Sequence, residues 1–192
     1  MKAWSIYVGL VVVFALGYLM FGPGGASDSA PIPSRGTHEP TARYWTSPGV
    51  EPDTCVSAWL LTRFVSPGAT VYIVKRAKDV NPAAQAAVIG GIPFDVAGCQ
   101  LQRRPGFSTT DAVIQAYAIN DAFALRVGAV IHEVELAPWT TSDEPFFVRV
   151  RAGLAEAVNS SDDDEACLHA AMDFLDRLRR EMESAQPAPK GT

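Results

Sequence analysis

The pattern of apolar and polar residues divides the chain into three parts. An uninterrupted apolar run, AWSIYVGLVVVFALGYLMF, occupies residues 3–21 and contains no charged side chain. Residues 22–43 are rich in Gly, Pro and Ser and show no apolar period. From residue 44 onward, short apolar runs alternate with polar and turn-forming residues, which is the pattern of a folded domain. We therefore predict a domain over residues 44–184 and a polar tail over residues 185–192.

The first 21 residues predict an N-terminal transmembrane helix. The length of the apolar run is close to the ~20 residues that a helix needs to cross the hydrocarbon core. Aromatic residues lie near both of its ends, where they favour the membrane interface. A cleavable signal peptide is the alternative, with GGA at residues 24–26 as its cleavage site, although the apolar region of such peptides is usually about 7–15 residues long. Residues 22–43 would be a flexible linker that holds the domain away from the membrane.

The charge and the small residues of the N-terminal segment predict the orientation of the helix in the membrane and the kind of partner it binds. Lys2 precedes the apolar run, so we expect its N-terminal side to face the cytoplasm. The chain would then be a single-pass protein of the bacterial inner membrane, with its domain facing the periplasm or the cell exterior. Ser5, Gly9, Val13 and Gly17 recur every four residues, and such a stripe allows another membrane helix to approach closely. An integral membrane protein is therefore the expected partner, and chance within a small-residue-rich span is the alternative.

Within the domain, the apolar spacing predicts an α+β fold that is mostly α, with a few short strands. Helices are expected where apolar residues recur every three or four positions, and strands where β-branched and aromatic residues run together. The expected helices cover residues 52–65, 79–88, 108–117, 120–136, 146–158 and a last segment that begins at Ser160 or Ser161. The domain is expected to begin with a short β-like segment at residues 44–46, and the expected strands after it cover residues 70–74, 92–95 and 99–102. We expect Asp53, Ser108 and Asn120 to cap three of the helices.

The acidic run at residues 162–165 fits the first turn of the last helix. Negative charge there and arginines near the other end complement the helix dipole. A calcium-binding loop would need a spacing of Asp residues that this run lacks. We therefore interpret the run as a solvated helix start.

Charge and cysteine content narrow the classes of function. The chain has 21 acidic and 16 basic side chains, which gives a net charge of -5, so we expect no nucleic-acid partner. Cys55, Cys99 and Cys167 have a spacing that matches no zinc or redox motif. We expect buried free thiols, and the alternative is one disulfide with one cysteine left over.

Four segments together carry a resemblance to a known family. They are DTCVSAWLLTRFVSPGATVYIV, GGIPFDVAGCQL, FSTTDAVIQAY and INDAFALRVGAVIHEVELA, in this order along the chain. Their order resembles the chromate-resistance family represented by the C-terminal domain of the chromate-responsive regulator ChrB. The resemblance covers about residues 44–180. In the cytoplasmic relatives, DNA binding belongs to a different N-terminal region, and no such region is seen in this sequence.

The resemblance extends to individual residues. Asp53 opens the first family motif, and Asp95 ends the IPFD of the second. Asp111 stands where the family tends to have an acidic residue, His132 matches the family His, and Glu135 replaces an Asp.

The departures fall mainly on chemically reactive positions. Ser57 and Ser108 stand where the family has cysteines, and Thr110 replaces a Phe. Residues 102–104 stand where a His-rich segment is expected. The resemblance therefore implies a diverged member that keeps the fold and has a reduced or altered site.

Asp53, Asp111, His132 and Glu135 form the best candidate site, for a divalent metal. His132 and Glu135 are three residues apart on one expected helix, so they share a face. A His and a carboxylate at that spacing can bind one divalent metal when other helices add carboxylates. In the alternative, Asp53 only caps its helix and His132 pairs with Glu135. No other cofactor is expected.

Three arginines are candidates for anion binding. Arg103 and Arg104 form a small basic loop whose two guanidinium groups can bind an oxyanion such as chromate. Arg63 can line an anion pocket. The alternatives are a solvated loop for the first two and a structural pair between Arg63 and Asp95.

The expected function is that of a membrane-anchored, extracytoplasmic accessory protein that binds a partner or ligand and does not catalyse a reaction. An accessory subunit of a membrane complex is one form that this function would take. The sequence contains no Ser-His-Asp order, phosphate-binding loop or dinucleotide fingerprint. The alternative is a metal-dependent or oxyanion-handling detoxification enzyme of the chromate-resistance type.

Overall fold

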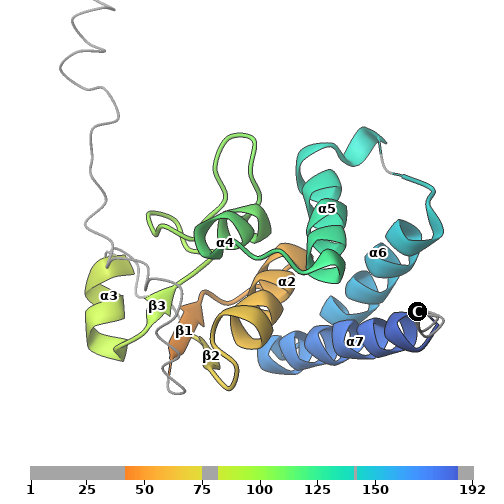
Figure 1. Ribbon diagram of the computed structural model, residues 1–192. Coiled ribbons are helices and arrows are strands. Elements are labelled where there is room, and N and C mark those ends of the chain that lie inside the picture. Colours follow the sequence, from red (N-terminus) through yellow and green to blue (C-terminus); the bar gives the residue numbers. More distant parts are fainter. Residues whose placement is uncertain (1–41, 75–81, 141, 186–192) are drawn as a thin grey trace, which may run out of the picture.

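The computed structural model describes residues 42–74, 82–140 and 142–185, and Figure 1 shows how their elements are arranged. The described part is mostly helical and contains one small sheet, so the expected α+β class is confirmed. The predicted anchor, residues 1–21, lies outside the described residues. None of the helices that the structure describes is long and apolar enough to cross a membrane.

Three short parallel strands form the sheet, in the order β2-β1-β3. Parallel neighbours need a long crossover connection, and a helix supplies it here between β1 and β2. That helix is α2, which continues without a break into the π-helical turn η1. The bounds are β1 Arg43–Thr46, α2 Pro52–Leu60, η1 Leu61–Val65, β2 Thr70–Ile73 and β3 Ile92–Pro93.

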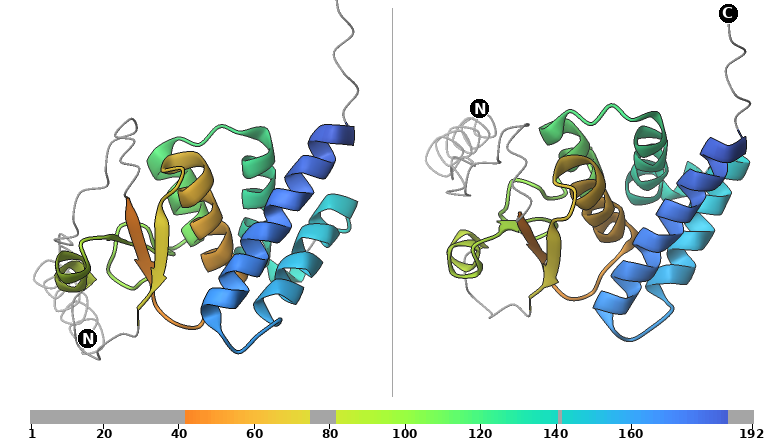
Figure 2. Two further views of the ribbon diagram at one scale, coloured as in Figure 1. Left: turned by 90° about the horizontal axis from the view of Figure 1, so that it is seen from below. Right: turned by 60° about the horizontal axis from the view of Figure 1, so that its bottom comes forward.

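Both faces of the sheet are covered. Successive side chains of a strand point to opposite faces, and in β1 Tyr44 enters the main core while Trp45 packs in a second cluster with Val96 and Cys99. Helix α3, Pro82–Ile89, lies on the side of the sheet opposite to the other helices (Figures 1 and 2). The sheet therefore separates a small core from a large one.

The main core lies among five helices. Helix α2 contacts α4, α5, α6 and α7, and its residues 53–60 are all buried. Helices α6 and α7 lie side by side, as both views in Figure 2 show. The bounds are α4 Thr109–Tyr117, α5 Ala122–Leu136, η2 Pro138–Thr140, α6 Pro145–Val158 and α7 Asp164–Ala185.

Several helix starts differ from the prediction. Ser108 caps α4 as expected, since its side chain accepts a hydrogen bond from Asp111 N. Glu51, rather than Asp53, is the N-cap of α2, because Pro52 already has helical geometry. Asp121, rather than Asn120, caps α5 through a hydrogen bond from Ala124 N. These shifts of one or two residues are within the usual uncertainty of helix ends.

The last helix begins later than predicted. Ser161 lies before it and accepts a hydrogen bond from Asp163 N, and α7 itself begins at Asp164. The Asp164 carboxylate accepts hydrogen bonds from Gly49 N and Val50 N, at 2.9 and 3.2 Å. One residue of the acidic run therefore joins α7 to the loop between β1 and α2.

The predicted strand at residues 99–102 is not formed. Asp95 has a φ of 52° and turns the chain out of the sheet directly after β3. Leu101 keeps a single bridge to Phe94, and its carbonyl accepts a hydrogen bond from Asp95 N at 2.7 Å. Gln102 to Phe107 then form a loop that leads into α4.

Candidate functional site

A group of polar side chains surrounds the N-terminus of α4. Asp53, at the start of α2, is fully buried, and its two carboxylate oxygens accept hydrogen bonds from Thr109 N and Thr110 N, each at 2.8 Å. The first N–H groups of a helix have no partner within the helix, and a carboxylate there is favoured. Burial raises the pKa of Asp53, while these hydrogen bonds act in the opposite direction. Asp53 thus joins the start of α2 to the start of α4, although Asp53 and Thr109 are 56 residues apart in sequence.

Asp95 belongs to the same group, although it was not among the predicted site residues. Its left-handed φ is unusual for a residue with a side chain, and such conformations often mark functional sites. Its carboxylate accepts hydrogen bonds from the hydroxyl groups of Thr54 and Thr109, the latter at 2.7 Å. The IPFD motif was the signal that could have identified it.

Arg103 reaches over this group from the loop before α4. Its Nη2 atom lies 2.5 Å from Glu135 Oε2, 3.5 Å from Glu51 Oε2 and 3.8 Å from Asp53 Oδ2. Burial raises the pKa of Glu135, and the Arg103 guanidinium opposes that rise. A single cation is therefore shared by three carboxylates, two at the N-terminus of α2 and one in α5.

His132 and Asp111 form a separate pair beside this group. His132 Nδ1 lies 2.8 Å from Asp111 Oδ2, which also accepts a hydrogen bond from Ser108 N at 2.9 Å. The alternative in which His132 pairs with Glu135 is therefore wrong, because the two side chains have different partners. The imidazole is half exposed, so solvent can reach the His132–Asp111 pair.

The structure thus brings the four predicted metal ligands to one region, but in separate interactions. Asp53 holds backbone amides, Glu135 holds Arg103, and Asp111 holds His132. Among the described residues, no group of three or more His, Cys, Asp or Glu side chains is arranged to hold a metal ion. A metal at Asp53, Asp111, His132 and Glu135 stays a prediction.

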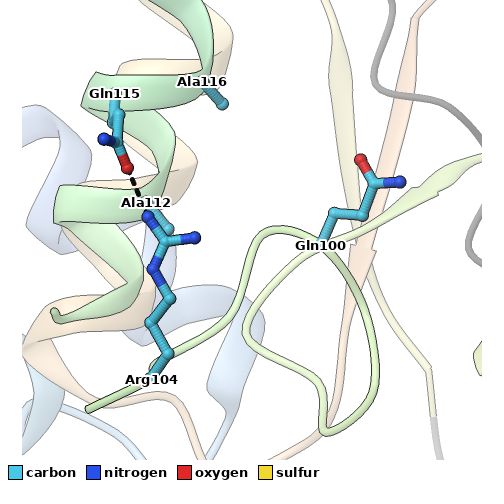
Figure 3. Close-up of a pocket in the computed structure, with 5 residues that line it drawn as sticks. All are labelled: Gln100, Arg104, Ala112, Gln115 and Ala116. Atoms are coloured by element: carbon cyan, nitrogen blue, oxygen red, sulfur yellow. Dashed lines mark hydrogen bonds between the residues drawn. The ribbon is translucent and has the colours of Figure 1, made fainter. Parts of the chain in front are cut away.

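The three predicted anion-binding arginines have different surroundings. Arg63 forms an ion pair with Asp176 of α7 at 3.0 Å. The alternative prediction, a structural pair between Arg63 and Asp95, is therefore wrong. The same Asp176 accepts a hydrogen bond from Trp59 Nε1 at 2.8 Å, so these contacts fix the end of α2 and η1 against α7. Arg103 is engaged by carboxylates, whereas Arg104 donates to the Gln115 side chain (Figure 3).

All three cysteines are free and buried, as expected. Burial raises the pKa of Cys55 to about 12 and that of Cys99 to about 11. Because the thiolate is the reactive form, neither thiol is poised for chemistry at neutral pH.

Comparison with known proteins identifies the family. A protein-family model described as ChrB, C-terminal domain, matches residues 44–182. The chain belongs to this family. The resemblance found in the sequence motifs is therefore confirmed, and the chain carries a chromate-resistance-type domain. No curated protein and no solved structure matched the chain.

The structure of this ChrB C-terminal domain explains why the quoted motifs occur together. Asp111 lies in the first turn of α4. That turn is contacted by Asp53 and Asp95 at Thr109 and by His132 at Asp111, from three other segments of the chain. Ser57 and Thr110, two of the positions that depart from the motif pattern in the sequence, lie 3.3 Å apart between their hydroxyl oxygens. Thr110 also donates its backbone N–H to Asp53, so this pair of hydroxyl groups lies beside the buried carboxylate.

Proposed function

We propose that this protein is a membrane-anchored, extracytoplasmic accessory protein that acts by binding through its ChrB C-terminal domain. The observation that carries the binding role is that the polar groups of the site are engaged with one another. Buried Asp53 accepts hydrogen bonds from two backbone N–H groups, and Glu135 is paired with Arg103. A site arranged in this way stabilises the fold and leaves few groups available for catalysis.

The sequence of the N-terminal segment supports the anchored location. The apolar run is long enough to span the hydrocarbon core, and its stripe of small residues suits close contact with another membrane helix. The domain would then be held near a membrane partner by the linker of residues 22–43.

Purification from native membranes tests this proposal. We expect the full-length chain to stay with the membrane after an alkaline wash, to retain its N-terminal residues by intact mass, and to co-purify with an integral membrane protein in mild detergent. A Gly9→Leu, Gly17→Leu variant should stay in the membrane and lose that partner, while Ala3→Leu is a control outside the stripe. A chain that is released by the wash after cleavage near residue 26, or that migrates alone, would contradict the proposal.

The second candidate is a metal-dependent or oxyanion-handling detoxification enzyme. The contact between half-exposed His132 and Asp111 favours it, because a carboxylate that orients an imidazole is a common feature of catalytic and metal sites. This candidate requires bound metal, or turnover of an oxyanion such as chromate, that depends on both His132 and Asp53. A His132→Ala variant that behaves as the wild type in both assays would remove it.

A further inference from the structure

A pocket lies beside α4, apart from the carboxylates around Asp53. Its volume is about 430 Å³, within the range of about 300–1,000 Å³ that is typical of small-molecule pockets. Figure 3 shows residues of α4 on one side of it and Gln100, from the loop after β3, on the other. The lining residues are Gln100, Arg104, Ala112, Gln115 and Ala116.

The charge of this pocket comes from Arg104. Arg63 is paired with Asp176, and Arg103 is paired with Glu135. Within the part of the chain that the structure describes, Arg104 makes no ion pair with a carboxylate, and its polar side-chain contact is with the neutral amide of Gln115. Of the three arginines predicted to bind an anion, Arg104 therefore keeps a positive charge that a ligand can use.

The Arg104 side chain is already held in position. Its guanidinium carbon lies 4.6 Å from the centre of the Phe107 ring, and one terminal nitrogen donates to Gln115 Oε1. Figure 3 shows the other terminal nitrogen pointing away from Gln115, across the pocket. A side chain that is ordered before binding loses less conformational entropy when a ligand arrives.

We propose that this pocket binds a small organic carboxylate. A carboxylate accepts charge-assisted hydrogen bonds from a guanidinium group, and the amide of Gln115 can bond to a hydroxyl or carbonyl group on the rest of the ligand. The methyl groups of Ala112 and Ala116 supply an apolar wall. A bare tetrahedral oxyanion would contact little besides Arg104 in a space of this size. The proposal does not depend on membrane anchoring, so either one can fail without the other.

Calorimetric titration of the full-length chain in mild detergent tests the proposal, with malate, glutarate and citrate as ligands and sulfate as the inorganic comparison. We expect at least one carboxylate to bind more tightly than sulfate. Arg104→Gln should weaken that binding about 10-fold or more, because the charge-assisted hydrogen bonds are lost. Arg180→Gln, which makes the same change of charge at an exposed position of α7, should keep the wild-type affinity.

A second variant tests the pocket without a change of charge. Gln115→Ala leaves Arg104 in place and removes the amide that holds it, and we expect several-fold weaker binding. Circular dichroism shows whether each variant is folded. The proposal is overturned if none of the three carboxylates binds, if sulfate binds as tightly, or if both pocket variants keep the wild-type affinity.

Discussion

Asp53 is the residue on which the site around α4 depends most. It is fully buried and accepts the first free N–H groups of that helix. A buried polar network is stable when every member has a partner, and removal of one member leaves another unpaired at a cost. Substitution of Asp53 should therefore lower the free energy of unfolding substantially, through the loss of these particular hydrogen bonds.

Asp53→Asn tests this role with little change of shape. The amide group keeps one acceptor oxygen and places an NH₂ group against the second backbone donor, so either Thr109 N or Thr110 N loses its partner. We expect the free energy of unfolding to fall by about 2 kcal/mol or more, measured by urea denaturation. Glu156→Gln, at an exposed position of α6, is the matched control. A loss below about 0.5 kcal/mol for Asp53→Asn would contradict the assigned role.

The buried thiols give a prediction with a defined pH dependence. The pKa of Cys99 is raised by burial from about 9 to about 11, so its thiolate fraction at pH 8 is about 100-fold lower than that of an ordinary thiol. The pKa of Cys55 is higher still. We expect slow reaction of the native chain with a disulfide reagent at pH 8, at a rate that increases toward pH 11. The unfolded chain should react at all three cysteines at once, and fast reaction of native Cys55 or Cys99 would disprove the prediction.

The sequence located the residues of the site better than it paired them. The motif positions pointed to Asp53, Asp111, His132 and Glu135, and all four lie near the start of α4. A separation of three residues suggested that His132 would pair with Glu135. The true partner of His132 is 21 residues away on another helix, and no local pattern encodes such a contact.

At the scale of elements, the packing of α6 on α7 depends on a small residue. A Cβ atom at Gly153 would come within 2.1 Å of the Phe174 ring. The two helices can approach as they do because position 153 has no side chain. The amphipathic pattern predicted both helices, but a glycine within a helical pattern gives no indication of which ring it faces.

Gly153→Ala tests this contact. Alanine favours a helix by about 1 kcal/mol over glycine, whereas overpacking typically costs about 1–3 kcal/mol. We expect a lower melting temperature for Gly153→Ala in the wild-type background. In a Phe174→Leu background, where the ring is absent, the same change should be neutral or stabilising. A stabilising effect in both backgrounds would contradict the prediction, because it would show that the Phe174 ring can move aside at little cost.

The strands were harder to predict than the helices. Residues 70–74 were identified because β-branched and aromatic residues cluster there, and β2 covers Thr70–Ile73. Residues 99–102, CQLQ, contain no β-branched or aromatic residue, and Asp95 turns the chain away before a further strand can pair. Such a turn at a residue other than glycine is imposed by tertiary contacts, here the hydrogen bonds from Thr54 and Thr109 to Asp95.

At the scale of the whole molecule, the structure joins a parallel βαβ unit to a helical bundle. Asp164 and Asp176 of α7 contact the loop before α2 and the end of η1, so the last helix holds both ends of the α2–η1 helix. The polar site lies at the start of α4, with His132 and Arg103 about half exposed. A partner or ligand can therefore reach the site from solvent without opening the core.

The central claim is that the polar groups of this site are satisfied by one another and that the protein acts by binding. Metal analysis by mass spectrometry tests it most directly. The full-length wild-type chain would be compared with His132→Ala and with His169→Ala, a control at an exposed position of α7. We predict no stoichiometric metal in any of the three. About one metal ion per chain in the wild type and the control, but not in His132→Ala, would contradict the claim and favour a metal-dependent enzyme.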